Sequence, residues 1–214
     1  MDVLLDNLDV FRRGFLGTLS LTVVSGLLAL ALGVVIAGFR VSPVPPLRAF
    51  GTAWVTVLRN TPLTLLFFIA VFALPRLGVS LSFYTLAILA LGFYTSAFVC
   101  EAVRSGINTV PLGQAEAARS LGMTFTQTLT QVVLPQAFRT VVPPIGSLLI
   151  ALTRNSSIAG AFSVFELFSV TRQLNEDGYS IWWLFFWVAV CYLVMSGVLI
   201  TLFRFLENRL AVAR

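Results

Sequence analysis

Residues 14–39 read GFLGTLSLTVVSGLLALALGVVIAGF, and this stretch decides the fold. It contains no charged side chain, and Arg12, Arg13 and Arg40 flank it. A helix needs about 20 apolar residues to cross the hydrocarbon core of a bilayer. The apolar core of a secretory signal peptide is shorter, at about 7–15 residues, and a cleavage site of small residues follows it. The sequence therefore predicts a membrane-spanning helix over residues 14–39 that is retained.

The rest of the chain has the same apolar character. Of its 214 residues, 58% are hydrophobic and 11% are charged, and the mean hydropathy is +0.94. Soluble domains carry about a quarter charged residues, so this chain needs lipid around it. Four more apolar runs are long enough to span, at about residues 49–74, 81–100, 133–165 and 181–203. The predicted fold class is all-α, an integral membrane protein with five transmembrane helices in a single domain over residues 1–214.

The segments between the apolar runs predict turns. Three prolines within Arg40–Arg48 end the first helix, because proline lacks an amide hydrogen and clashes with the preceding turn. Residues 108–132 are polar and predict a loop of two short helices in water, with a turn at Gly122 between them. Thr124 and Gln127 fit a capping box for the second short helix.

The composition excludes several classes of enzyme. The chain has no histidine, and all 14 basic residues are arginine. A P-loop needs a lysine on the phosphates, a Schiff-base enzyme needs a lysine amine, and catalytic triads and zinc sites generally use histidine. We therefore expect no catalytic residue, no metal site and no cofactor. The arginines are dispersed, and no stripe of aromatic residues is interleaved with them. We therefore expect membrane lipid as a partner, and no nucleic acid.

The distribution of arginine predicts the orientation. With the amino terminus outside, the cytoplasmic segments contain eight arginines and the outer segments contain four. Cytoplasmic loops carry the excess of positive charge, so we expect an outer amino terminus and a cytoplasmic carboxyl terminus in the plasma membrane. The cytoplasmic set is Arg40, Arg48, Arg104, Arg119, Arg139, Arg204, Arg209 and Arg214, and the outer set is Arg12, Arg13, Arg76 and Arg172.

Two further arginines, Arg59 and Arg154, fall inside predicted spans. A charge at the centre of a membrane helix costs about 2.5–3.5 kcal/mol on insertion scales, so such residues rarely face lipid. Each begins a similar polar string, Arg59-Asn60-Thr61 and Arg154-Asn155-Ser156. These strings would line a substrate pathway or gate. The alternative is that the two arginines snorkel to the interface or pair with other helices.

One cytoplasmic motif resembles a known family. Residues 113–122 read GQAEAARSLG, and residues 132–137 read VVLPQA. This pattern closely resembles the EAA loop of ABC importer permeases, in which Glu-Ala-Ala, three residues, Gly and a downstream Leu-Pro recur. The string Arg59-Asn-Thr-Pro62 is similar to the Arg-x-Thr-Pro of polar amino acid permeases. The chain looks most like the glutamate-system permeases of Gram-positive bacteria.

The resemblance implies a transport subunit rather than an enzyme. Its partners would be a second, identical or different, permease subunit, a dimer of cytoplasmic ABC ATPases that hydrolyse the ATP, and an extracytoplasmic amino acid binding protein. The small side chains of Ala117 and Ala118 would let a groove of the ATPase approach the helix closely. Glu116 and Arg119 would contact that ATPase, Glu116 by pairing with an arginine. Gly122 would permit the sharp turn that exposes the coupling helix.

The resemblance also bears on the substrate. Permeases for cationic amino acids can carry acids at the positions that align with Leu148 and Asn155, whereas this chain has no acid between Arg119 and Glu166. A cavity that contains Arg59 and Arg154 without a compensating carboxylate would suit an anionic or neutral polar amino acid. We expect glutamate, with glutamine or another polar amino acid as the alternative.

Two other classes of function remain open. A secondary transporter would also use intramembrane charges and broken helices, although it would not require an EAA loop. An intramembrane hydrolase would lack a histidine or lysine base for its serine.

Overall fold

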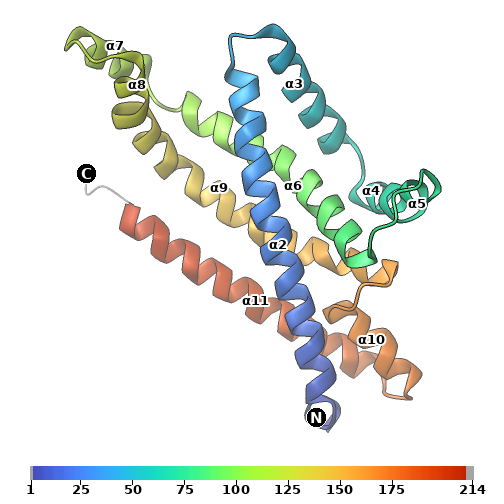
Figure 1. Cartoon of the computed structure of the whole chain (residues 1–214). Coiled ribbons are helices and arrows are strands. Elements are labelled where there is room, and N and C mark those ends of the chain that lie inside the picture. The colour runs from blue at the N-terminus through green and yellow to red at the C-terminus, as the bar shows by residue number, and fades with distance from the viewer. Residues whose placement is uncertain (1, 211–214) are drawn as a thin grey trace.

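The computed structural model describes residues 2–210, and every regular element in that range is helical (Figure 1). Met1 and residues 211–214 lie outside the described residues, so Arg214 of the charge count is not placed. Two π-helical turns and one 3₁₀ segment join some of the α-helices, at Ile69–Ala73, Thr128–Val133 and Ser156–Phe162. The α-helices are α1 (Asp2–Asp6), α2 (Leu8–Val41), α3 (Pro45–Asn60), α4 (Leu63–Phe68), α5 (Leu74–Arg76), α6 (Phe83–Asn108), α7 (Leu112–Ser120), α8 (Phe125–Gln127), α9 (Leu134–Asn155), α10 (Leu167–Glu176) and α11 (Ile181–Leu210).

Four helical segments are long and apolar enough to cross a membrane, namely α2, α6, the run Phe125–Glu176 and α11. The pair Pro45–Asn60 and Leu63–Arg76 makes a fifth if its bent halves count as one span. The predicted fold class, an all-α membrane protein, is confirmed. Residues 14–39 lie entirely within α2, and residues 181–203 lie within α11.

Glycines let α2 pack closely against other segments as it crosses the bundle (Figure 1). A Cβ atom at Gly33 would lie 3.0 Å from the Ser96 carbonyl oxygen of α6. One at Gly14 would lie 3.3 Å from the carbonyl oxygen of Glu166, just before α10. Small residues favour such packing in membranes, where lipid supplies no hydrophobic force between helices. The first span is thereby fixed to α6 near one end and to the start of α10 near the other.

Residues 49–74 do not form the single helix that the sequence predicts. α3 ends at Asn60, and the chain bends by 103° before it continues as α4, a π-helical turn and α5. Thr61 is extended, with φ −97° and ψ 129°. Pro62 favours this conformation, because a proline ring disfavours the α conformation for the residue before it.

The third helix is longer than the sequence predicts. α6 continues to Asn108, beyond the predicted end at residue 100, so Glu101 and Arg104 lie within it. A charge usually ends an apolar run because it needs water. These two charges are tolerated inside the helix because Glu101 pairs with Arg104 and with Arg40 of α2.

The fourth predicted span, residues 133–165, differs at both ends. Its helical run begins earlier, at Phe125, and α9 ends at Asn155, where a 3₁₀ segment follows. The hydroxyl of Ser156 donates to the Thr153 carbonyl at 2.7 Å, and that of Ser157 donates to the Arg154 carbonyl at 2.8 Å. Such short-range hydroxyl bonds compete with the regular helical pattern. The helix therefore tightens at the Arg154 string.

The bundle separates two sets of connections. The turn between α2 and α3 and the hairpin of α7 and α8 lie at one end of the molecule, whereas the amino terminus and α10 lie at the other (Figure 1). These are the two groups of segments that the distribution of arginine assigns to opposite sides of the membrane.

Candidate functional site

The polar loop 108–132 forms a hairpin of α7 and α8, called here the α7–α8 hairpin. Gly122 forms the turn with φ +83°, a left-handed conformation that favours glycine. The backbone amide of Thr124 donates to Gln127 Oε1 at 2.9 Å, and the backbone amide of Gln127 donates to Thr124 Oγ1 at 3.3 Å. The turn and the capping box are thus where the sequence predicts them, although α8 continues without a break toward α9.

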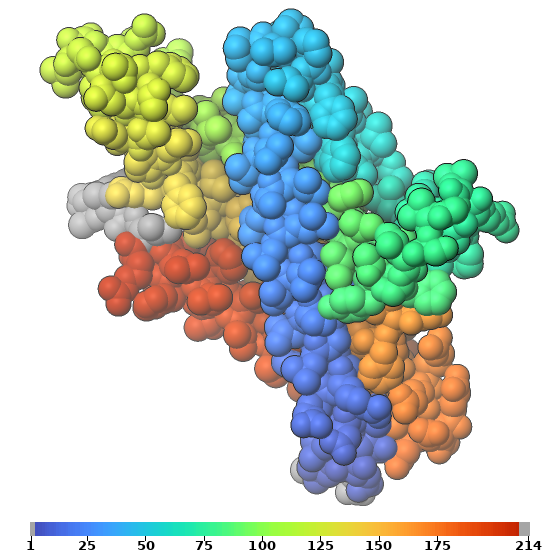
Figure 2. Space-filling view, in the orientation of Figure 1, coloured from blue at the N-terminus to red at the C-terminus, as the bar shows by residue number. Residues whose placement is uncertain are grey.

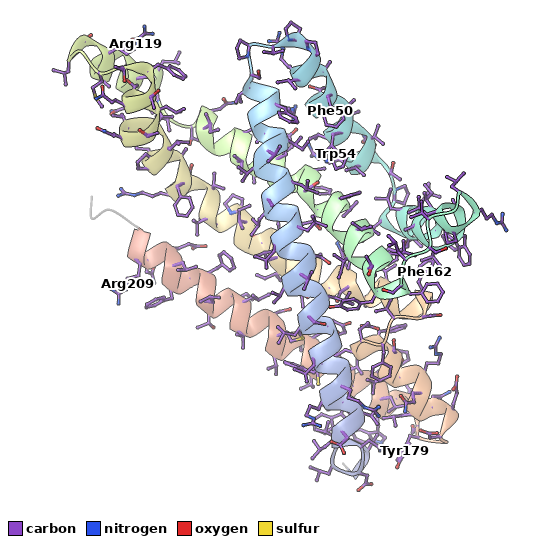
Figure 3. The ribbon with its side chains drawn as sticks, viewed as in Figure 1. Phe50, Trp54, Arg119, Phe162, Tyr179 and Arg209 are labelled. Atoms are coloured by element: carbon purple, nitrogen blue, oxygen red, sulfur yellow. The ribbon has the colours of Figure 1, made fainter. Side chains whose placement is uncertain are left out.

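The α7–α8 hairpin projects from the bundle as a separate lobe (Figure 2), with Arg119 at its outer part (Figure 3). Leu112, Leu121 and Phe125 are 81%, 85% and 73% exposed. Glu116, Ala117 and Arg119 are also exposed, whereas Ala118 is buried. Large apolar side chains that are exposed beside charges indicate a protein-binding surface.

The first polar string lies where α3 ends. The side chains of Asn60 and Thr61 donate to the carbonyls of Thr56 and Val57, at 2.8 and 2.7 Å. Arg59 Nη1 lies 3.5 Å from Glu101 Oε1. The expectation that no carboxylate compensates Arg59 is therefore wrong, because α3 packs against α6 and brings this arginine to Glu101.

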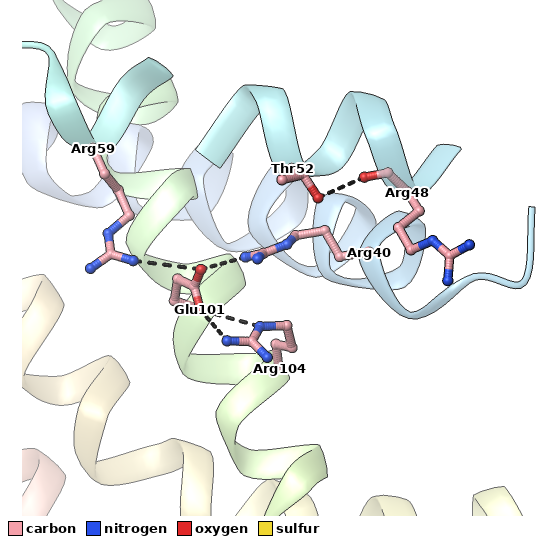
Figure 4. Close-up of polar contacts among 6 residues, drawn as sticks. All are labelled: Arg40, Arg48, Thr52, Arg59, Glu101 and Arg104. Carbon is pink, nitrogen blue, oxygen red and sulfur yellow. Dashed lines mark hydrogen bonds and ion pairs between the residues drawn. The ribbon is translucent and has the colours of Figure 1, made fainter. Parts of the chain in front are cut away.

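Glu101 joins three helices (Figure 4). Arg40 of α2 forms a close ion pair with its Oε1. Arg104, one turn further along α6, donates to its Oε2 from Nη2 at 2.9 Å and from Nε at 3.2 Å. A cavity of about 310 Å³ lies beside this cluster and is lined by Arg40, Val55, Thr56, Arg59, Asn60, Phe98 and Glu101. Sequence analysis missed Glu101, although its spacing to Arg104 is that of a helical ion pair.

The second polar string lies at the end of α9. Arg154 is exposed, and it takes part in none of the four ion pairs found among the described residues. Asn155 is half-buried and Ser156 is fully buried. The cavity beside Arg59 includes none of these three residues in its lining. Within this chain, the structure does not bring the two strings into the single cavity that the sequence suggests.

Glu166 is a second acid that sequence analysis did not single out. It is fully buried and precedes α10. Its carboxylate accepts hydrogen bonds from the Phe168 and Ser169 amides, both at 2.9 Å, and from the Tyr192 hydroxyl at 2.7 Å. The Thr18 hydroxyl donates to it at 3.5 Å. The carboxylate therefore links α2, α10 and α11 without an ion-pair partner among the described residues.

Comparison with known proteins gives the chain a family. It matches the binding-protein-dependent transport system inner membrane component over residues 29–212. It is 37% identical over 210 residues to the probable glutamine ABC transporter permease protein GlnM of Bacillus subtilis, covering 98% of this chain and 97% of that one. It is 42% identical over 172 residues to the glutamate transport system permease protein GluC of Corynebacterium efficiens, covering 75% of each.

A solved structure agrees with these sequences. The crystal structure of an amino acid ABC transporter with histidines matches with a TM-score of 0.91 and 28% identity, covering 96% of both chains. The family model covers most of this chain, and the helices that it matches include the α7–α8 hairpin and both polar strings. The chain therefore belongs to the family of binding-protein-dependent transport system inner membrane components, as a non-catalytic permease subunit of an ABC transporter.

Proposed function

We propose that this permease conducts amino acids for an ATP-driven importer and that glutamate is its substrate. The names of the two relatives above, one for glutamine and one for glutamate, support an amino acid with a polar side chain. The named structural neighbour, an amino acid ABC transporter, supports the same class.

The observation that carries glutamate is the position of Arg154. Its exposed side chain lies at a break in a helical run that is apolar enough to span a membrane. No carboxylate of the described residues lies within ion-pair distance of it. A guanidinium facing lipid there would be strongly disfavoured, so water and a second subunit, rather than lipid, face it. A carboxylate side chain would satisfy it with two parallel charge-assisted hydrogen bonds. Arg154 and Asn155, with Ser156 behind them, form the substrate site in this proposal.

Glutamine is the second candidate, and the name of the Bacillus subtilis relative favours it. Its carboxamide oxygen would accept a hydrogen bond from Arg154, but it would leave the positive charge uncompensated. Glutamate therefore makes the stronger interaction.

The partners follow from the surfaces. The exposed leucines and charges of the α7–α8 hairpin suit a dimer of cytoplasmic ATPases, with Glu116, Ala117 and Arg119 at the contact and the buried Ala118 behind them. A second permease subunit would cover the exposed polar strings that lipid cannot solvate. The opposite end, with the amino terminus and α10, would face outward in a bacterial plasma membrane and receive the amino acid binding protein.

Purification of the complex from its native membrane tests this function. We expect ATPase chains, a binding protein and a second permease chain to co-purify, and we expect glutamate as the bound amino acid. Mass spectrometry identifies the chains and the ligand together. ATP-independent uptake by the permease alone would support a secondary transporter instead, and a bound cationic amino acid would contradict glutamate.

Replacing Gly122 with valine tests the coupling role of the hairpin. A residue with a Cβ in the left-handed region costs about 1–2 kcal/mol, and more when it is β-branched. We expect the hairpin to shift and the uptake per ATP hydrolysed to fall severalfold in proteoliposomes.

Two matched controls separate coupling from strain. Gly78 has φ +84° and open space around it, as Gly122 has, but it lies in the turn after α5. Gly113 lies in α7 with open space and without a positive φ. Gly78→Val and Gly113→Ala, the latter adding only a small side chain to the hairpin, should keep the wild-type ratio of uptake to hydrolysis. An equal loss in Gly78→Val would show that strain anywhere, and not the hairpin, reduces transport.

A further inference from the structure

Glu101 has an excess of positive partners. Three arginines, Arg40, Arg59 and Arg104, share its single carboxylate (Figure 4). The cluster therefore has a formal charge of +2 from these four side chains. The side chains of Arg40 and Glu101 are only 16% and 22% exposed, and a charge that is largely removed from water is costly unless it is paired. A second anion beside this cluster would reduce that cost.

Arg59 is the most weakly held of the three arginines. Its ion pair with Glu101 measures 3.5 Å, whereas Arg104 donates to the other carboxylate oxygen at 2.9 Å. The Arg59 side chain is 45% exposed. Its guanidinium lies 5.5 Å from the centre of the Phe98 ring. A guanidinium has five N–H donors, so one long ion pair leaves most of its donors for another acceptor.

The space for such an acceptor is present. The cavity of about 310 Å³ beside Arg59 is also lined by Asn60, Thr56 and Glu101. Asn60 and Thr61 keep their side chains bonded to α3. Of the two arginines that line the cavity, Arg59 is the more exposed, at 45% against 16% for Arg40. Arg40 and Arg104 would hold Glu101 in place if Arg59 turned away, because each contacts the carboxylate independently.

We propose that this cavity is a carboxylate subsite on the substrate pathway, in which Glu101 is the resident counter-anion of Arg59. The inference rests on the proposed function, because it assigns to the amino acid the carboxylate that enters. The entering carboxylate takes over the Arg59 guanidinium, and Glu101 remains on Arg40 and Arg104. When the substrate leaves, Glu101 recovers Arg59. Glu101 is thus a positioning residue that weakens retention of the substrate and so promotes its release.

Glu101→Gln tests the competition. The variant keeps the shape of the side chain and removes the competing charge, so Arg59 becomes free to bind. Binding is measured by radioligand titration of the whole complex in nanodiscs, without the binding protein. We expect the affinity for glutamate to rise about tenfold, from the loss of one nearby like charge. The rise should disappear in Arg59→Gln/Glu101→Gln, because the two residues act on one site.

Two amides of glutamate identify which carboxylate enters. Glutamine retains only the α-carboxylate, and isoglutamine retains only the side-chain carboxylate. Glu101→Gln should tighten glutamate and one of these two amides, and the amide that does not respond has lost the carboxylate that binds Arg59. Glu207→Gln removes an acid from α11 outside the cluster and should change none of the three affinities.

Arg104→Gln is a second variant, and it should change the affinity for glutamate in the opposite direction. Arg104 is on the far oxygen of Glu101 and does not line the cavity, so its loss leaves Glu101 more available to Arg59. We expect glutamate to bind severalfold more weakly, whereas a general loss of folding would weaken binding in both variants.

One outcome would overturn the counter-anion role and leave the proposed function intact. The wild-type complex would bind glutamate, but Glu101→Gln would change the affinities for all three ligands equally or not at all. Absence of glutamate binding and uptake in the wild type would instead overturn the proposed function, and this subsite with it.

Discussion

Arg154→Gln should lower glutamate uptake by at least about a hundredfold at limiting substrate. In the assembled complex the second permease subunit would cover Arg154, so its pair with the substrate carboxylate would be buried. Removing one member of a buried charge pair costs roughly 3–5 kcal/mol, and each 1.4 kcal/mol corresponds to about a tenfold change. Glutamine keeps hydrogen-bonding capacity at this position but removes the positive charge that a carboxylate needs. Uptake of labelled glutamate and glutamine into proteoliposomes, at matched amounts of assembled complex, measures the loss. Glutamine uptake should fall less than glutamate uptake.

The neighbouring residue and a distant arginine provide the controls. Asn155→Asp places a negative charge beside the same site and should also lower glutamate uptake. Arg209→Gln removes an exposed arginine from α11 and should leave uptake unchanged. Wild-type glutamate uptake in both Arg154→Gln and Asn155→Asp would contradict the proposed site.

Glu166→Ala should cause the largest loss of stability among single substitutions in this chain. Its carboxylate accepts hydrogen bonds from the backbone amides of Phe168 and Ser169 and from the hydroxyls of Tyr192 and Thr18. All of these donors would lose their acceptor in a buried site. Each hydrogen bond to a charged group contributes about 1.5–3 kcal/mol, but such effects are not additive. We expect a loss of about 3–5 kcal/mol, within the range for a disrupted buried network.

The stability measurement needs a variant that retains the shape. Thermal unfolding of the purified complex and the yield of assembled protein are compared for Glu166→Ala and Glu166→Gln. Glutamine retains one acceptor oxygen and should restore part of the loss. Glu176→Ala removes an exposed acid from the end of the same helix, α10, and should have little effect. Equal stability of Glu166→Ala and wild type would show that the network does not hold these helices together.

Features that depend on nearby residues were predictable. The apolar run 14–39 indicates a span because the length of a helix and the thickness of a bilayer are fixed. The capping box of Thr124 and Gln127 joins residues that are three positions apart. Gly122 marks a turn because glycine has no Cβ to strain a positive φ. In each case the energetic reason lies within a few turns of helix.

The break in the second span was only partly predictable. Pro62 follows the string Arg59-Asn60-Thr61, and proline is a known signal for the end of a helix. Hydropathy nevertheless continues through it, because leucines and phenylalanines follow at once. The 103° bend depends on how α4 packs on α6 and on the 3₁₀ segment, which hydropathy does not measure.

The sequence by itself determined an all-α membrane protein, the position of the α7–α8 hairpin and the two polar strings. Only the tertiary structure showed that Arg59 has a carboxylate near it and that Glu166 is buried. The Arg40–Glu101 pair joins residues 61 positions apart, and the Thr18–Glu166 pair joins residues 148 apart. Composition and periodicity report the preference of each segment for lipid or water. They do not report which side chains from separate helices meet, because close packing of the whole bundle decides those pairs.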